Sequence, residues 1–479
     1  MKVLSVASEI APLVKTGGLA DVVSALPLAI GNHGVEMRTL VPGYPVILDA
    51  LGKGKQVLTE GNLFGGPVQV LYGTVGDQQL YVLDAAHLFY RGGGPYAAPD
   101  GYDWWDNPER FAALSWMGAR LANEGQIHGW KPDVVQAHDW QAGLTPVYMQ
   151  RLGASHSVGS VMTIHNIAFT GSAGAEMIHA LRLPLEGYNE GGFEFYGRIS
   201  MLKAGIAYSD RVNTVSPTYA QELRTPALGM GFDGILRYKG AHFSGILNGI
   251  DGDAWNPETD ENIISYKVLR GKAKARAALV AEMGLAEDAP GPLCVGVSRL
   301  TDQKGMDLLL GALPRLLERG GQFVLLGSGS PAFEADFRAA AARAPDRVAV
   351  HIGYDEALAH RIIAGGDAIL IPSRFEPCGL TQLYGLRYGT VPVVARTGGL
   401  ADTVIASTFA TQRAKAATGI VHVPGSLDAL KGAIDDLCDL WAQPRLYQQM
   451  QRNGMKFPVG WDSSAADYAA LFREAARTL

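Results

Sequence analysis

Two basic side chains follow a short apolar segment in the second half of the sequence. Residues 293–297 have the composition of a buried parallel strand, and Arg299 and Lys304 lie on the loop that opens the next helical segment. A helix N-terminus attracts anions through its free N–H groups and its dipole. Because doubly wound folds bind ligands at the carboxyl ends of their strands, we predict that this pair holds a diphosphate; two solvated surface charges are the alternative.

A second loop combines a carboxylate with backbone N–H groups. It follows the apolar segment 368–371 and reads PSRFEPCGLTQLYG, in which Glu376 comes shortly before a helix start at Gly379. The amides of Leu380 and Thr381 can bind the distal phosphate of a sugar diphosphate while Glu376 faces the sugar. A helix-capping role is the alternative for Glu376.

Two nearby features could suggest other chemistry. Cys378 lies beside Glu376, but the sequence fixes no base near it, so we predict a residue that lines the site and not a nucleophile. Asp251 and Asp253 form a DGD that resembles a metal-binding DxD motif. Because they lie among Asn, Gly and Pro, a turn is the better interpretation, and we predict no metal site.

The segments that must position these loops alternate between apolar strands and helices. A chain of 479 residues is too long for one core, and its 47% hydrophobic and 18% charged residues supply apolar surface for two. The predicted strands are residues 3–7, 133–137, 161–164 and 211–215 in the first half, and residues 293–297, 323–326, 348–352, 368–371 and 391–395 in the second. This alternation predicts an α/β fold with doubly wound parallel sheets.

A hinge is predicted at the segment ILNGIDGDAWNPETDEN, which is rich in Gly, Asn, Asp and Pro and has no apolar period. We assign residues 1–245 to an N-terminal domain and residues 246–457 to a C-terminal domain. Residues 458–479 form a final segment whose helix is expected to return to the first domain. Two similar turns, KTGGLADV from Lys15 and RTGGLADTV from Arg396, each follow a strand and open a helix, which favours a facing pair of domains.

Composition and charge exclude several classes of protein. The net charge of −6 offers no general attraction to a nucleic-acid backbone. The three cysteines are widely spaced without a CxxC pattern, so neither a disulfide framework nor a zinc site is indicated. The amino-terminal residues lack the features of a signal peptide, and no apolar run is long enough to span a bilayer. We expect a cytoplasmic protein that binds neither nucleic acid nor membrane.

Six motifs in the chain resemble those of the bacterial glycogen synthase and plant starch synthase family. They are KTGGLADV, HDWQAGL, TIHNIAFTG, NGID, SRLTDQKG and EPCGLTQLYGLRYGTVPVV, in the family's order across almost the whole chain. The resemblance implies a GT-B fold, in which two Rossmann-like domains face each other across a deep cleft, with the acceptor on the N-terminal side and the nucleotide sugar on the C-terminal side. It also implies retaining transfer of glucose from ADP-glucose to the non-reducing end of glycogen or another α-1,4-glucan, without a cofactor or a metal. The residue types themselves leave ADP-glucose and UDP-glucose open.

The family's functional residues fall on defined positions of this sequence. The resemblance associates catalysis with Lys15, His165, Arg299, Lys304 and Glu376. It associates binding of the nucleotide sugar with Lys15, Gly17, Gly18, Asp21, Asp139, Asn248, Arg299, Lys304, Tyr354, Cys378, Gly379, Leu380 and Thr381. In this scheme the three cations contact the phosphates, His165 and Glu376 lie at the sugar, and Tyr354 stacks on adenine. Asp139 lies on the opposite wall, and Asn248 makes a contact on the hinge side. Helix capping is the alternative role for Asp21.

One position separates this chain from other retaining GT-B enzymes. Many of those enzymes carry a second Glu eight residues after the first, whereas this sequence has Tyr384 there. In this respect the sequence resembles the glycogen and starch synthase branch. The difference argues against the branches similar to sucrose synthase and trehalose phosphate synthase. The alternative functions are an α-glucan phosphorylase-like enzyme, which would use pyridoxal phosphate, and a non-catalytic glucan-binding protein with the GT-B fold.

Overall fold

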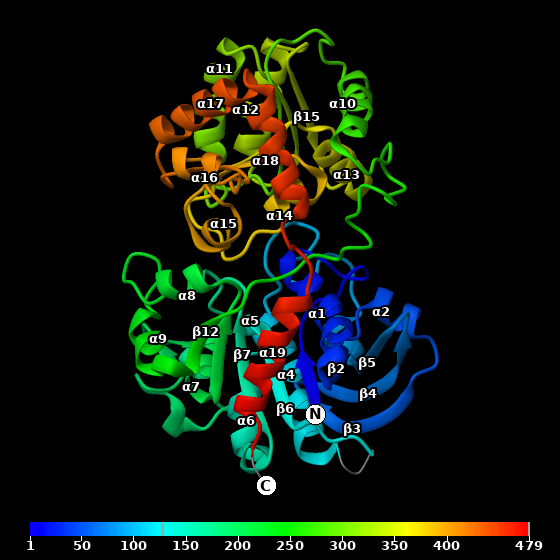
Figure 1. The fold of residues 1–479 in the computed structure, drawn as a ribbon. Coiled ribbons are helices and arrows are strands. Elements are labelled where there is room, and N and C mark those ends of the chain that lie inside the picture. The colour runs from blue at the N-terminus through cyan, green and yellow to red at the C-terminus, as the bar shows by residue number, and fades with distance from the viewer. Residues whose placement is uncertain (126–128, 478–479) are drawn as a thin grey trace. The chain divides into compact units, whose positions relative to one another are not determined.

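The computed structural model describes residues 1–125 and 129–477, and the chain divides into two compact units (Figure 1). The N-terminal unit consists of residues 1–248 and the chain from Trp461 onward, and the C-terminal unit consists of Gly249–Gly460. These divisions fall beside the boundaries assigned after residues 245 and 457. No helix in the described part of the chain is both long and apolar enough to cross a membrane.

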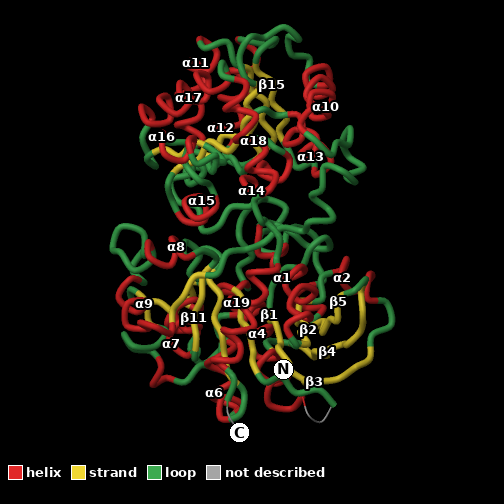
Figure 2. Tube along the Cα trace, viewed as in Figure 1, coloured by secondary structure: helices red, strands yellow, loops and turns green. Residues whose placement is uncertain are grey.

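The N-terminal unit is built on a nine-stranded sheet with the strand order β12-β11-β7-β6-β1-β2-β5-β4-β3. Figure 2 shows its strands in yellow and the helices around them in red. All neighbours from β12 to β5 are parallel, whereas β4 is antiparallel to both β5 and β3. The strands are β1 (Lys2–Val6), β2 (Glu36–Pro42), β3 (Lys55–Leu63), β4 (Gly66–Val75), β5 (Gln78–Asp84), β6 (Val134–His138), β7 (Gly159–Ile164), β11 (Arg211–Thr214) and β12 (Phe243–Gly245). A small separate sheet contains β8 (Ser172–Ala173), β9 (Glu194–Phe195) and β10 (Arg198–Ser200).

Helices cover both faces of this large sheet because its buried strands are apolar on both sides. Successive residues of β6 show the alternation: Val134 belongs to the apolar cluster that includes Tyr468, and Val135 belongs to the cluster that includes Phe111. The helices are α1 (Gly18–Ala29), α2 (Pro45–Leu51), α3 (Ala86–Phe89), α4 (Asn107–Glu124), α5 (Asp139–Ala142), α6 (Thr145–Leu152), α7 (Met201–Tyr208), α8 (Pro217–Glu222), α9 (Asp233–Lys239) and α19 (Asp462–Ala475).

The last helix, α19, is part of the N-terminal unit. Tyr468 and Phe472 are fully buried in a cluster that they share with side chains of α1 and β1. The Tyr468 hydroxyl also accepts a hydrogen bond from Asn213 Nδ2 at 3.2 Å. The end of the helix lies so close to β7 that a Cβ atom on Gly159 would lie 1.9 Å from the Ala475 carbonyl oxygen. Glycine at position 159 therefore permits this packing.

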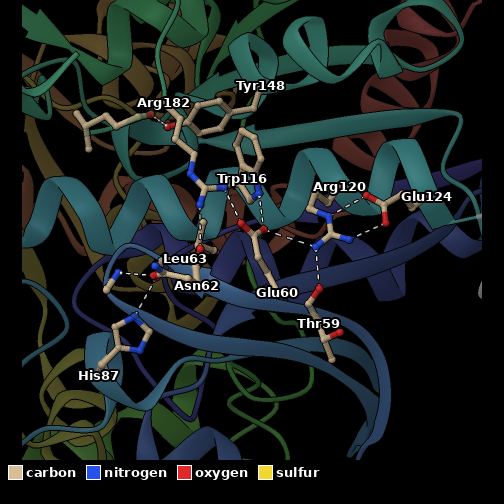
Figure 3. A network of polar contacts seen from close by, with 12 residues as sticks. Thr59, Glu60, Asn62, Leu63, His87, Trp116, Arg120, Glu124, Tyr148 and Arg182 are labelled. Atoms are coloured by element: carbon tan, nitrogen blue, oxygen red, sulfur yellow. Dashed lines mark hydrogen bonds and ion pairs between the residues drawn. The ribbon is translucent and has the colours of Figure 1, made fainter. Parts of the chain in front are cut away.

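The far edge of the sheet, four strands from β1, is fixed by charged side chains (Figure 3). Glu60 on β3 accepts hydrogen bonds from Trp116 Nε1 at 2.8 Å and from Arg182 Nη1 at 2.6 Å. The Arg182 guanidinium also lies over the Trp116 ring, 4.7 Å from its centroid. Arg120 on α4 lies 3.5 Å from Glu60 and pairs with Glu124 at 2.7 Å. This network joins β3 to α4 and to the loop at residue 182, away from the central strands.

The C-terminal unit contains a six-stranded parallel sheet with the order β15-β14-β13-β16-β17-β18. The strands are β13 (Leu293–Val297), β14 (Gln322–Gly327), β15 (Val348–Ile352), β16 (Ala368–Ile371), β17 (Val391–Ala395) and β18 (Ile420–His422). Cys294 belongs to one apolar cluster and its neighbours Leu293 and Val295 to another, as expected for a strand buried on both faces. The helices are α10 (Leu269–Glu282), α11 (Met306–Glu318), α12 (Pro331–Arg343), α13 (Glu356–Gly365), α14 (Thr381–Tyr388), α15 (Gly398–Thr403), α16 (Phe409–Arg413), α17 (Leu427–Trp441) and α18 (Pro444–Lys456).

The predicted strands of the second half coincide with β13, β15, β16 and β17, and β14 extends one residue further at each end than predicted. Those of the first half match β1, β6, β7 and β11 with shifted ends. Among the strands of the two large sheets, the prediction missed β2, β3, β4, β5, β12 and β18. The antiparallel strands β3 and β4, at and next to the edge of the N-terminal sheet, are only partly buried, so they lack the continuous apolar run on which the prediction relied.

Candidate active site

Each large sheet has a switch point, a pair of adjacent strands from which the chain winds outward in opposite directions. The predicted site residues lie on the segments that follow these strands. In the C-terminal sheet β13 lies next to β16, and the loops after them carry Arg299, Lys304 and Glu376. In the N-terminal sheet β1 lies next to β6, and the chain after them carries Lys15 and Asp139. Doubly wound folds bind ligands at such switch points.

Lys304 and Glu376 are paired at the switch point of the C-terminal unit. The Lys304 ammonium lies 2.5 Å from Glu376 Oε2, which also accepts a hydrogen bond from Ser373 Oγ at 2.9 Å. Glu376 is only 5% exposed, so these partners offset the cost of burying its charge. Arg299 is exposed, and its guanidinium forms no hydrogen bond or ion pair with residues that the structure describes. Arg299 therefore supplies a cation that can accept an anionic ligand without breaking another pair.

The loop that carries Glu376 rests on the second TGG turn. Gly398 has a φ of +44°, and a Cβ atom there would lie 1.8 Å from the Glu376 carbonyl oxygen. The Gly399 N–H donates to that same carbonyl at 3.2 Å, and a Cβ on Gly399 would lie 2.3 Å from the Cys378 oxygen. The second TGG turn thus packs directly against the backbone of the Glu376 loop, and only glycine permits so close an approach of the two backbones.

The predicted phosphate-binding amides lie at the start of α14. Leu380 is the N-cap residue and Thr381 the first helical residue, so the first-turn N–H groups have no acceptor within the helix. Gly379 has a φ of +72°, which reverses the chain just before the helix. Gln382 Nε2 donates to the carbonyls of Cys378 and Gly379 at 3.1 and 2.9 Å and fixes this turn. Cys378 is 4% exposed and belongs to the buried wall of the loop.

Tyr354 lies on the loop between β15 and α13 of the same unit. Its side chain is 74% exposed, and its hydroxyl donates to Glu356 Oε2 at 2.6 Å. The ring is held at one end while most of its surface faces solvent. Such a ring can stack on a planar group such as a nucleobase.

Tyr384 has a packing role that explains why an aromatic residue fits this position. It is stacked on Trp255 with 3.7 Å between ring centroids, and Trp255 is stacked on His360 at the same distance. His360 Nδ1 lies 2.7 Å from Asp260 Oδ2, which also accepts from Tyr388 at 2.6 Å. The stack joins α13, which follows the Tyr354 loop, to α14, which follows the Glu376 loop. A Glu at 384 would leave Trp255 without this ring.

In the N-terminal unit the first TGG turn is open to solvent. Lys15 Nζ lies 3.0 Å from Asp21 Oδ1, and Gly17 and Gly18 are exposed at the start of α1. A Cβ atom on Gly17 would meet no atom within 4 Å. Asp21 lies in the first turn of the helix and pairs with Lys15, while Gly17 is the N-cap residue.

The backbone beside Lys15 is held by a buried carboxylate. Glu9 is 2% exposed, and its two oxygens accept hydrogen bonds from the Thr16 N–H at 2.5 Å and the Thr16 hydroxyl at 2.6 Å. Tyr96 also donates to Glu9, and Ser8 Oγ lies 2.7 Å from the Tyr96 hydroxyl. These hydrogen bonds fix Thr16, the residue next to Lys15.

Asp139 and His165 lie together at the end of β6 and β7. Asp139 Oδ1 accepts hydrogen bonds from the backbone N–H groups of His165 at 2.7 Å and Asn166 at 3.4 Å. Asp139 has a φ of +52°, an uncommon conformation for a residue other than glycine. Burial raises the pKa of Asp139 to about 7, although these two hydrogen bonds oppose the shift. Burial also lowers the pKa of His165 to about 3, so its ring is neutral near pH 7.

Asn248 and the DGD segment lie where the two units divide along the chain. Asn248 is 7% exposed, and its Oδ1 atom has no hydrogen-bond partner among the described residues. Asp251 Oδ1 accepts from the N–H groups of Asp253 and Ala254 at 2.9 and 3.0 Å. Asp251 therefore stabilises a turn, as the sequence suggested.

The structure brings three pairs of the predicted residues into contact: Lys304 with Glu376, Asp139 with His165, and Lys15 with Asp21. Sequence reasoning missed Glu9, Tyr96 and His138. His138 directly precedes Asp139 in HDW, and Glu9 follows the first strand just before KTGG, so position relative to a strand end was the available signal. Tyr96 is separated from Glu9 by 87 positions in the sequence, so no local sequence pattern predicts that contact.

Two doubly wound units with polar residues at their switch points are the architecture of the GT-B class of glycosyltransferases, and the family comparisons assign the chain to that class. Residues 2–238 match the family model described as starch synthase catalytic domain, and residues 284–457 match the one described as glycosyl transferases group 1. The chain belongs to the glycogen synthase family.

Its relatives match over nearly the full length. The chain is 57% identical to a glycogen synthase of Paracoccus denitrificans over 98% of each sequence, and 55% identical to one of Jannaschia sp. over 99% of each. Among solved structures, the catalytic domain of starch synthase IV from Arabidopsis thaliana bound to ADP and acarbose is 31% identical, with a TM-score of 0.88 and coverage of 99% of both chains.

Proposed function

We propose that this glycosyltransferase moves glucose from ADP-glucose to the non-reducing end of an α-1,4-glucan such as glycogen, with retention of the α-anomer. The observation that carries the proposal is the β13/β16 switch point, where the loop that carries Arg299 and Lys304 contacts, through the Lys304–Glu376 pair, the loop that opens α14. Cations and helix amides suit a diphosphate leaving group, and a carboxylate suits a sugar. The ADP in the related starch synthase IV structure supports adenine as the base.

In this proposal the leaving diphosphate is stabilised by positive charge. Arg299 and Lys304 bind its oxygens, and the N–H groups of Leu380 and Thr381 bind the distal phosphate. The bond from the anomeric carbon to the phosphate oxygen breaks as the acceptor hydroxyl oxygen bonds to the same carbon from the same face. The departing phosphate takes the hydroxyl proton. Glu376 stabilises the positive charge that develops on the sugar while the bond to the phosphate breaks.

We assign Lys15 to the departing phosphates as well, and the remaining residues to binding. Tyr354 presents an exposed ring on which adenine can stack, and Lys15, beside the open Gly17–Gly18 turn, contacts the phosphates. His165 and Asp139 contact the sugar and the acceptor side, where a neutral imidazole suits hydroxyl groups. Asn248 offers its unpartnered Oδ1 to a hydroxyl or an amine.

The proposed reaction needs neither a cofactor nor a metal. Arg299 and Lys304 supply the charge that a divalent ion would otherwise supply, and Asp251 already binds two backbone amides. Among the described residues no group of three or more His, Cys, Asp or Glu is arranged to hold a metal ion. We expect a chelator to leave the activity unchanged, and a large loss that magnesium or manganese restores would contradict this.

The three free cysteines fit a reducing cytoplasm.

The test is incubation of the purified protein with glycogen and labelled ADP-glucose or UDP-glucose. Incorporation of glucose into glycogen from ADP-glucose, with less from UDP-glucose, is the expected result. Phosphate-dependent release of glucose 1-phosphate by a protein with pyridoxal phosphate absorbance would instead establish a phosphorylase. Binding of glycogen without incorporation from either sugar nucleotide would establish a non-catalytic protein.

A further inference from the structure

Three buried side chains form a line of hydrogen bonds across the central strands of the N-terminal unit. Ser5 Oγ on β1 lies 3.0 Å from His138 Nε2 at the end of β6, and His138 Nδ1 lies 2.9 Å from His165 Nε2 just after β7. Ser5 and His138 are each 1% exposed, and His165 is 9% exposed. Because β1, β6 and β7 are adjacent and parallel, their carboxyl ends place the three side chains in one row. We call this row the Ser5–His138–His165 chain.

Both imidazoles in the chain are neutral at physiological pH. Burial lowers the pKa of His165 to about 3. Burial also lowers the pKa of His138, and a charge on His165 would lower it further. A neutral imidazole carries one proton, so each ring has one nitrogen that donates and one that accepts. The hydrogen bonds therefore have a direction that proton counting can determine.

The direction follows from the Ser5 hydroxyl. Among the described residues its only hydrogen-bond partner is His138 Nε2. If that nitrogen carried the proton, it would donate to Ser5 Oγ, and the buried hydroxyl hydrogen would have no acceptor. Leaving a buried hydroxyl hydrogen without an acceptor is unfavourable, because the group has given up its hydrogen bonds to water. The favoured arrangement is therefore donation from Ser5 to Nε2 of His138, and from Nδ1–H of His138 to Nε2 of His165.

This arrangement leaves the proton of His165 on Nδ1, the nitrogen that has no partner among the described residues. We propose that Ser5 and His138 are positioning residues that hold His165 as the Nδ1–H tautomer, so that His165 presents a hydrogen-bond donor to an oxygen of the transferred sugar. Asp139 fixes the backbone of His165 independently through its N–H group. The backbone and the ring of one residue are thus held by two different partners. The contact with the sugar rests on the proposed function, whereas the tautomer does not.

The tautomer can be measured directly by ¹⁵N NMR on full-length protein labelled at histidine, with His165→Gln to assign the signals. We expect a pyrrole-like shift on Nδ1 of His165 and a pyridine-like shift on Nε2. Ser5→Ala removes the hydroxyl that sets the direction, so the His165 signals should move toward a mixture of tautomers. Ser5→Thr retains a hydroxyl and should keep the wild-type signals. Ser115→Ala, another fully buried serine of the same unit, is the matched control and should change neither ring.

The same variants separate a positioning role from simple packing. Loss of one neutral hydrogen bond corresponds to about a tenfold fall in kcat/KM for the nucleotide sugar in Ser5→Ala, with recovery in Ser5→Thr. A pyrrole-like shift on Nε2 of His165 in the wild type would overturn the proposal, and so would an unchanged tautomer in Ser5→Ala. A changed tautomer with unchanged kcat/KM would overturn the positioning role. A wild-type protein that lacks glucosyl transfer but shows the expected shifts would contradict the proposed function and leave the tautomer assignment intact. If Ser5→Ala fails to fold, the wild-type and Ser5→Thr spectra decide the tautomer.

Discussion

The two TGG turns have nearly the same sequence and opposite surroundings. In KTGGLADV the residues Thr16, Gly17 and Gly18 are exposed, and a Cβ on Gly17 would meet nothing within 4 Å. In RTGGLADTV the corresponding residues are buried, and Cβ atoms on Gly398 and Gly399 would collide with the backbone of the Glu376 loop. The first turn leaves room for a ligand, and the second supports the loop that carries a proposed catalytic residue. A local motif predicts the turn, while its neighbours decide what the turn does.

The carboxylates of the two units differ in a similar way. Glu376 is buried with Lys304 as a cationic partner at 2.5 Å. Asp139 is buried with two backbone N–H groups as its hydrogen-bond partners, and burial raises its pKa to about 7. One unit therefore holds a carboxylate beside a fixed cation, and the other holds a carboxyl group that titrates near neutral pH. Substitutions in matched pairs can test both contrasts.

The largest expected effect distinguishes the cations that precede the two turns. If Lys15 binds the departing diphosphate, Lys15→Ala should lower kcat by about 10² to 10³, the scale for loss of one preorganised electrostatic group. Arg396→Ala is the matched control and should stay within about a factor of two of the wild type, because its turn faces the Glu376 loop and not a ligand. Steady-state kinetics at saturating glycogen measure both. Equal losses in the two variants would remove the distinction between the turns.

A smaller effect should appear in stability. Gly398→Ala places a methyl group against the Glu376 carbonyl at a positive φ, which should lower the free energy of unfolding by about 2 to 4 kcal/mol. Gly17→Ala adds its methyl group to open space at an extended φ and should change stability by less than about 1 kcal/mol. Chemical denaturation of both variants compares them. A Gly398→Ala protein as stable as Gly17→Ala would show that the second turn does not support the loop.

The pH dependence of stability tests the contrast between the carboxylates. Because the pKa of Asp139 is raised to about 7, the native state keeps a proton that the unfolded chain releases. This group therefore favours folding at about pH 4, and its contribution falls as the pH rises toward about 7. Asp139→Asn keeps the acceptor oxygen and tolerates the positive φ, so it should remove that decline, which is about 4 kcal/mol for a pKa raised to about 7. Unfolding at several pH values in both proteins measures the difference, and parallel curves would contradict the raised pKa.

The sequence predicted the parts of the molecule that local patterns encode. Strands such as β13 and β16 were found because they are continuous apolar runs, and Arg299, Lys304 and Glu376 were predicted as site residues because they follow those strands. The contacts that give these residues their properties are between distant segments. The contact of Gly398 with the Glu376 loop and the hydrogen bonds of the Ser5–His138–His165 chain depend on strand order, which no local pattern specifies. The bounds of β13, β15, β16 and β17, in contrast, needed little more than hydrophobicity.

The central claim is that Arg299 and Lys304 stabilise the departing diphosphate, and kinetics of four proteins test it most directly. They are the wild type, Arg299→Ala, Lys304→Ala and the double variant, compared at saturating glycogen with ADP-glucose varied. The attraction grows as the bond breaks, so each single change should lower kcat by about 10² to 10³ with a smaller change in KM. The double variant should lose less than the product of the two, because both cations act on one group. Normal kcat with a raised KM in both single variants would show that they only bind the ground state, and would contradict the account.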